Sequence, residues 1–111
     1  MTSTDYSILD DLADDPGVIN ARKMTAIYGA ILDAASLAGG RFSAASVRPN
    51  LPAHLTDDPR VGAAFSALVA GRVARKTGRF TLSGNARSRN AQRPVCEYVV
   101  TDWAALEARA A

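Results

Sequence analysis

Apolar residues recur at the spacing of one buried helix face in two separate stretches of the chain. The first stretch predicts a helix over residues 21–37, rich in alanine and ended by Gly39-Gly40. Its apolar positions are Ile27, Ile31, Ala34 and Ala38. A short acidic segment precedes it, and we expect residues 1–20 to form a flexible tail with at most one helical turn.

The second stretch predicts a helix that ends near Ala70, before Gly71. Pro59 suits its first turn, and we expect Thr56 or Asp57 to cap it. Its buried positions are Val61, Ala64, Phe65 and Leu68, and its opposite face carries Arg60, Ala63, Ser66 and Ala67. We expect the core to centre on Phe65, which would face Ile27, Ile31 and Tyr98.

A shorter helix is predicted between these two, beginning at Ser43, a good N-cap residue. Phe42 precedes the cap and is expected to act as a hydrophobic staple, and with Val47 to anchor the helix to the core. Pro49 and Pro52 keep this helix short. An irregular connector follows, with two apolar residues expected inside, Leu51 and Leu55.

After Gly71 the apolar period changes from helical to two, which is typical of strands. Val73 and residues 80–82 are typical of a strand that is broken or bent at Thr77-Gly78, and residues 95–100 of a second strand. Together they predict a β-hairpin. On the second strand Cys96, Tyr98 and Val100 share one face, and Glu97 and Val99 the other. Asp102 is expected to cap a last helix over residues 103–110, docked by Trp103 and Leu106.

The chain of 111 residues has room for one core, and its 48% hydrophobic and 22% charged residues are ordinary for a globular domain. No stretch is long and apolar enough to predict a membrane span, and the acidic N-terminus does not resemble a signal peptide. One cysteine cannot form an internal disulfide. We therefore expect a cytoplasmic protein.

Catalytic and metal-binding patterns are missing from the sequence. His54 is the only histidine, expected at the surface of the connector, and Cys96 is the only cysteine. Neither a zinc site nor a nucleophile–base pair can be built from them, and no glycine-rich phosphate loop is present. We expect a binding module without enzymatic activity, metal or cofactor.

Charge is distributed unevenly along the chain. Residues 1–21 carry five acids and no base, whereas residues 72–93 carry seven bases and no acid. A basic block of this kind is typical of a protein that binds a polyanion, because uncompensated like charges repel one another. The alternative is a solvated, solubilising loop.

The order of these elements resembles that of winged helix-turn-helix DNA-binding domains. The matching pieces are residues 39–43 before a second helix, residues 61–71 as a third helix, and residues 72–76 and 93–98 as the two sides of a wing. The chain is similar to small proteins of this class from actinobacteria and their phages. The resemblance covers residues 22–101 and implies an α+β fold with a three-helix core, a C-terminal hairpin wing and short flanking helices. We thus expect a tail over residues 1–20, a winged-helix domain over 21–101 and a C-terminal helix over 102–111.

The resemblance implies double-stranded DNA as the partner, with the third helix in the major groove and the wing along the backbone or minor groove. The residues expected at DNA are Arg41, Arg48, Asn50, Arg60, Ser66, Arg72, Arg75, Lys76, Arg79, Asn85, Arg87, Arg89, Asn90 and Arg93. A transcriptional regulator and a recombination or architectural factor both fit this set.

The third helix offers little for reading bases, since Arg60 is its only long polar side chain on the exposed face. Its small Ala/Ser face also suits packing against a protein. The alternative is therefore a protein-interaction module on the same frame, such as a phage protein that binds a host target, or a homodimer formed through this face.

Overall fold

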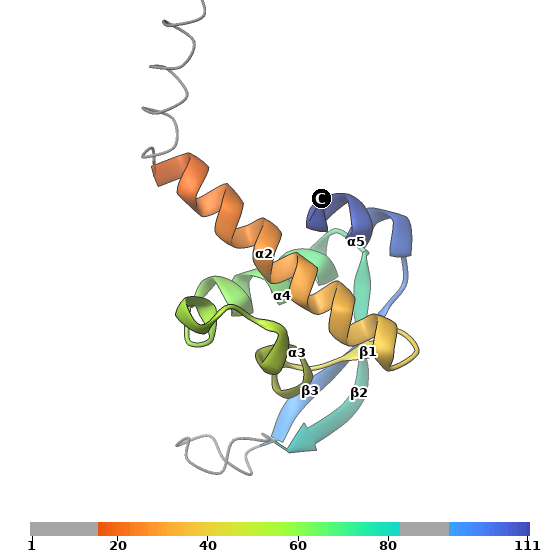
Figure 1. Ribbon diagram of the computed structural model, residues 1–111. Helices are drawn as coiled ribbons and strands as arrows, with labels where there is room; N and C mark the ends of the chain where they lie inside the picture. The colour runs from red at the N-terminus through yellow and green to blue at the C-terminus, as the bar shows by residue number, and fades with distance from the viewer. Residues whose placement is uncertain (1–15, 83–93) are drawn as a thin grey trace, which may run out of the picture.

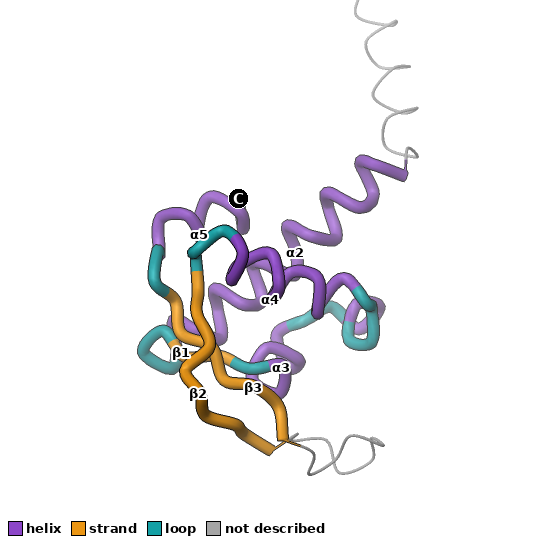
Figure 2. The backbone as a smooth tube through the Cα atoms, turned by 180° about the vertical axis from the view of Figure 1, so that it is seen from behind, coloured by secondary structure: helices purple, strands orange, loops and turns teal. Residues whose placement is uncertain are grey.

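The computed structural model describes residues 16–82 and 94–111. Along the chain its elements are α2 (Pro16–Leu37), β1 (Arg41–Phe42), α3 (Ala44–Val47), the 3₁₀ turns η1 (Arg48–Asn50) and η2 (Ala53–Leu55), α4 (Arg60–Ala70), β2 (Ala74–Leu82), β3 (Pro94–Val100) and α5 (Trp103–Ala110). The strands form one antiparallel sheet in the order β1-β3-β2. The expected α+β class is confirmed. The long helix α2 crosses in front of the sheet, and seen from behind the sheet and α4 lie before α2 (Figures 1 and 2).

Helix α2 begins at Pro16, five residues before the predicted start. Residues 16–20, which were expected in the flexible tail, therefore form the first turn of this helix and the start of its second turn. Proline is well tolerated at the first helical positions, where its missing N–H is not needed. The acidic residues 1–15 lie outside the described residues.

Strand β1 was not predicted. Its two residues pair with β3, Arg41 opposite Val99 and Phe42 opposite Tyr98. The turn before it contains two successive left-handed residues, Gly39 at φ 64° and Gly40 at φ 95°. This conformation favours glycine and turns the chain from α2 back onto the sheet. Phe42 was expected to be a staple for the next helix, but it is a strand residue whose ring stacks on Tyr98.

Helix α3 is capped as expected. The Ser43 hydroxyl accepts a hydrogen bond from the Ser46 backbone N–H at 3.2 Å, and the Ser46 hydroxyl accepts one from the Ser43 N–H at 2.8 Å. This reciprocal arrangement is a capping box built with serine at both ends. Val47, and Leu51 and Leu55 in the connector, are buried as predicted, and His54 is exposed.

The cap of α4 differs from the prediction. Neither Thr56 nor Asp57 caps it; the Asp58 carboxylate accepts the Arg60 backbone N–H at 2.9 Å instead. Its predicted end is confirmed, because Gly71 follows Ala70 as the C-cap residue. The predicted orientation is also confirmed. Ala64, Phe65 and Leu68 are buried and Val61 partly so, whereas Ala63 and Ser66 are exposed.

One face of the sheet closes the core. The rings of Phe42, Phe65 and Tyr98 meet there with centroids 5.3–5.6 Å apart. Burial raises the pKa of the Tyr98 phenol. Ile27 and Ile31 from α2 are fully buried in the same cluster. The central position expected for Phe65 is therefore confirmed.

Helix α5 has the predicted bounds, and the Asp102 side chain caps it by accepting the Ala105 N–H at 3.1 Å. Leu106 is fully buried, but Trp103 remains 40% exposed. The Arg109 guanidinium lies 5.5 Å from the centre of the Tyr28 ring, which ties α5 to α2. Of the two residues expected to dock this helix, Leu106 does so fully and Trp103 only in part.

Candidate nucleic-acid interface

Four exposed basic residues follow α4 into the first hairpin strand: Arg72, Arg75, Lys76 and Arg79. We call these four residues the β2 basic strip. None of them forms an ion pair with another residue that the structure describes. No acid lies between residues 72 and 82, so the strip has no compensating charge of its own. Exposed cations without intramolecular partners are free to contact an anionic ligand.

Pairing of the strands divides these cations between two faces of the sheet. Arg41 and Arg75 both lie opposite Val99, one on each side of it, and so share a face. Lys76 lies opposite Tyr98 and so is on the other face of the sheet. This is the face on which the Tyr98 ring packs into the core. Since β2 is an edge strand, cations on both faces border one free edge. The arrangement follows an edge and does not form a flat patch.

Arg72 precedes the strand in an unusual conformation. Its φ of 58° makes it the one non-glycine residue with positive φ in the described ranges. The left-handed conformation costs a residue with a Cβ roughly 1–2 kcal/mol. Hydrogen bonds hold it on both sides, from the Arg72 N–H to the Val69 carbonyl at 3.1 Å and from the Thr101 hydroxyl to the Arg72 carbonyl at 2.9 Å.

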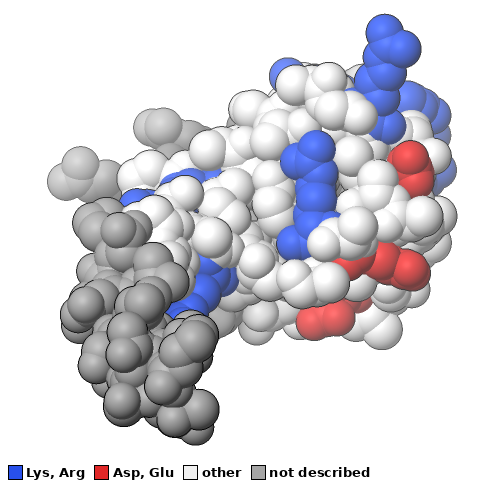
Figure 3. Space-filling model, turned by 90° about the horizontal axis from the view of Figure 1, so that it is seen from above, with Lys and Arg blue, Asp and Glu red and all other residues white. Residues whose placement is uncertain are grey.

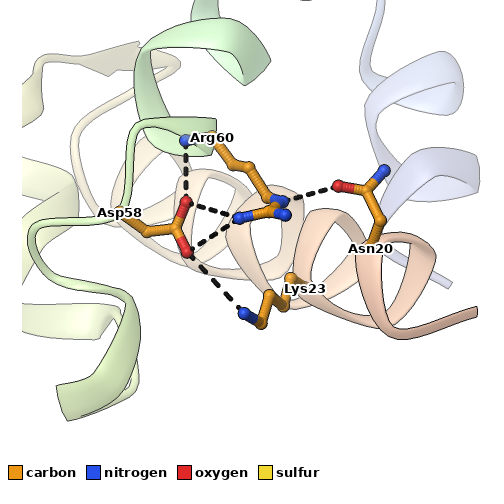
Figure 4. Close-up of polar contacts among 4 residues, drawn as sticks. All are labelled: Asn20, Lys23, Asp58 and Arg60. Carbon is orange, nitrogen blue, oxygen red and sulfur yellow. Dashed lines mark hydrogen bonds and ion pairs between the residues drawn. The ribbon is translucent and has the colours of Figure 1, made fainter. Parts of the chain in front are cut away.

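Two other arginines expected at DNA are already neutralised. Arg48 pairs with Asp57 at 2.8 Å. Arg60 pairs with Asp58 at 3.1 Å, and its Nε donates to the side chain of Asn20 on α2 at 2.5 Å (Figure 4). These contacts occupy the only long polar side chain on the exposed face of α4. Within the described structure, Arg60 therefore joins α4 to α2 and does not project freely.

Asp58 is the centre of this network. It accepts the Arg60 backbone N–H, pairs with the Arg60 guanidinium, and lies 4.0 Å from the Lys23 ammonium (Figure 4). The Arg60 N–H is the main reason that the pKa of Asp58 is lowered, and the two cations add to it, against the opposing effect of desolvation. The folded state thus favours the carboxylate.

Asp58 should therefore make folding depend on pH. A carboxyl group with a lowered pKa stabilises the fold above its unfolded-state pKa, about 3.9, and loses this effect as pH falls through the folded pKa. In Asp58→Asn, which keeps an acceptor for the Arg60 N–H, we expect a lower melting temperature than wild type at pH 7, and this gap should close below about pH 4. Thermal melts from pH 7 to pH 3 measure it. Asp57→Asn is the control, because its side chain is 87% exposed and its ion pair is screened by water. An Asp58→Asn gap that is independent of pH would contradict the role of its charge.

The remaining expected residues are placed as follows. Asn50 is exposed on η1 and Ser66 is exposed on α4. Five others, at the tip of the hairpin, lie outside the described residues: Asn85, Arg87, Arg89, Asn90 and Arg93. The structure therefore lines up the four residues of the strip along β2 and the turn just before it, with Arg41 across β3 on the face of Arg75. It places Asn50, Ser66 and the paired arginines on other elements.

Two residues beside the strip were not singled out from the sequence. Glu97 on β3 accepts a hydrogen bond from the Thr77 hydroxyl at 2.9 Å, so this nearby acid is held by a neutral partner. Phe80 on β2 is 65% exposed. The alternation of a strand predicts which face of the sheet Phe80 lies on. It does not predict whether helices cover that face at Phe80, so its exposure could not be read from the sequence.

Figure 3 shows the end of the molecule at which α2 begins. Basic side chains stand apart from one another among neutral ones, and acidic side chains gather toward one side. No dense basic patch is visible on this face, in contrast to the succession of cations along β2.

Comparisons with family models, curated proteins and solved structures find no match. Among the residues that the structure describes, no group of three or more His, Cys, Asp and Glu side chains is placed to hold a metal ion. None of the helices in residues 16–82 and 94–111 has the length and apolar character needed to cross a membrane. The candidate site therefore rests on charge and geometry alone.

Proposed function

We propose that this protein binds DNA on a winged-helix frame, with the β2 basic strip as its main described contact. The observation that carries the proposal is the pairing state of the basic residues. The acids next to α4 neutralise Arg48 and Arg60, whereas Arg72, Arg75, Lys76 and Arg79 are exposed and have no ion-pair partner in the described ranges. Neutralising phosphates releases counterions and supplies most of the affinity in such contacts.

The order of elements supports the same proposal. Helix, short strand, short helix, helix and hairpin follow one another, and the sheet order is β1-β3-β2. This agrees with the order on which the resemblance to winged helix-turn-helix domains rests. In such domains the hairpin follows the DNA backbone, and here β2 carries three exposed cations without an ion-pair partner among the described residues, Arg75, Lys76 and Arg79. Because folds host many functions, the charge of the site carries more weight than the fold.

Contacts to phosphate should dominate over contacts to bases. Hydrogen-bonding side chains on base edges give sequence specificity, and arginine and asparagine are the usual readers. Helix α4 exposes Gly62, Ala63, Ser66 and Ala70, and Arg60 is held by Asp58 and Asn20. A protein of this kind binds many sequences with similar affinity, which favours an architectural or recombination factor over a site-specific regulator.

Titration of duplex DNA at several salt concentrations tests this function. The double variant Arg75→Ala/Lys76→Ala should bind more weakly than wild type. The negative slope of log K against log salt should become shallower by up to about two units, since each phosphate contact contributes about −0.9. The control Arg22→Ala/Arg48→Ala removes the same charge from α2 and η1, and its slope should change less. Equal effects of the two double variants would show that net charge, and not the strip, controls binding.

The small-residue face of α4 favours a second function. Ala63 and Ser66 are exposed there, and small side chains permit close approach of another protein surface. A protein-interaction module, or a homodimer formed through α4, would use this face. Ala63→Arg should then abolish binding of the protein partner or the second copy, which light scattering measures for a homodimer. DNA affinity should not decrease. Arg75→Ala/Lys76→Ala should instead weaken DNA binding and leave the association through α4 unchanged.

A further inference from the structure

The phenylalanines of this protein have very different environments. Phe42 and Phe65 are 2% and 6% exposed, whereas Phe80 is 65% exposed. Phe80 lies opposite Cys96, and Cys96 lies two residues before Tyr98 on the same face of β3. The sheet face that holds the Phe42–Tyr98 stack in the core thus continues outward and presents a third aromatic ring, that of Phe80, to solvent.

A bulge in β2 places Phe80 next to Lys76 along this face. Lys76 pairs with Tyr98 and Phe80 pairs with Cys96, so residues 77–79 of β2 lie opposite Glu97 alone. Gly78 adopts φ 84° within the bulge. The Thr77 hydroxyl accepts the Arg79 N–H at 3.1 Å and lies 2.9 Å from Glu97 Oε1, to which it donates. Because the bulge is held by these bonds, Lys76 and Phe80 become neighbouring side chains on one face.

An exposed aromatic ring next to cations on a strand has a specific use in nucleic-acid binding. Bases stack on the ring whatever their identity, and the cations neutralise the phosphates on either side. Phe80 has Lys76 beside it on its face and Arg79 before it in the chain, both exposed and without an ion-pair partner among the described residues. In an uninterrupted duplex both faces of a base are covered by its neighbours, so stacking on a protein ring costs unstacking, whereas an unpaired base is already available.

We propose that Phe80 is a stacking platform for an unpaired base, and that the protein prefers DNA with a single-stranded segment to an uninterrupted duplex. This inference rests on the proposed DNA binding and names its substrate class. The poor base-reading face of α4 fits it, because stacking is tolerant of sequence and needs no recognition helix. The strip holds the backbone, and Phe80 distinguishes an unpaired strand from a paired one.

Fluorescence anisotropy with three DNA ligands tests the proposal: a mixed-sequence single strand of about 16 nucleotides, its blunt duplex, and the same strand with abasic sites at its centre. The variant Phe80→Ala should weaken single-strand binding about tenfold and duplex binding by less than about twofold, which corresponds to the loss of one stacked base. Phe80→Leu, which keeps apolar bulk without the ring, should weaken the single strand nearly as much. Wild type should bind the abasic strand about as weakly as Phe80→Ala binds the normal strand.

The outcomes separate this inference from the proposed function. Duplex binding by wild type together with unchanged single-strand binding by Phe80→Ala would overturn the stacking platform and leave the basic strip in place. Wild-type affinity in Phe80→Leu would likewise overturn it, because an apolar contact would then suffice. If wild type binds none of the three ligands at low salt, both proposals fail. Thermal melts check that the variants remain folded, as expected for a side chain that is 65% exposed.

Discussion

Replacing Phe65 by alanine is expected to lower the free energy of unfolding by about 3–5 kcal/mol, the usual cost of removing a buried aromatic side chain. Phe65 is 6% exposed and contacts the rings of both Phe42 and Tyr98, at centroid distances of 5.6 and 5.3 Å. The change removes α4's largest contribution to this cluster and leaves a cavity between α4 and the sheet. Since small domains have a total stability of about 5–15 kcal/mol, a large fraction of it would be lost.

Chemical denaturation monitored by circular dichroism measures this loss. Phe80→Ala is the matched control, because it makes the same substitution at an exposed position, where changes usually stay within about 0.5 kcal/mol. A loss below about 1 kcal/mol for Phe65→Ala would be incompatible with a core centred on this ring.

Replacing Arg87, Arg89 and Arg93 together by alanine is expected to cause the largest loss of DNA affinity. These residues carry three of the seven positive charges in the acid-free stretch 72–93. If all three contact phosphates, the negative slope of log K against log salt becomes shallower by at most about three units, because each contact contributes about −0.9. The side chains lie outside the described residues, so this expectation rests on the sequence alone.

The matched control for the hairpin tip removes three charges elsewhere, through Arg22→Ala, Lys23→Ala and Arg48→Ala. Its net charge equals that of the tip variant, so a difference between the two reports the position of the charges. Duplex titrations from low to moderate salt measure both slopes, and thermal melts check folding. An unchanged slope in the tip variant would exclude the tip from the interface.

The sequence by itself determined most of the local structure. Apolar periodicity predicted the orientation of α4 with Ala64, Phe65 and Leu68 inward, and alternation predicted which residues of β3 share a face. Glycine and serine marked ends that the structure confirms, at Gly71 and Ser43. These features depend on residues within a turn or two of one another, so the chain's local propensities are sufficient to specify them.

Tertiary structure decided the features that join distant segments. Arg41–Phe42 becomes a strand only because β3 lies beside it, and no two-residue pattern predicts that pairing. Arg60 was expected to be free, but Asp58 and Asn20 hold it, and Asn20 is 40 residues away in sequence. Exposure of Phe80 likewise depends on where the helices end above the sheet. Sequence fixes how many charges and rings a chain has, but the pairing of strands and of ions over long sequence separations determines which of them stay free for a ligand.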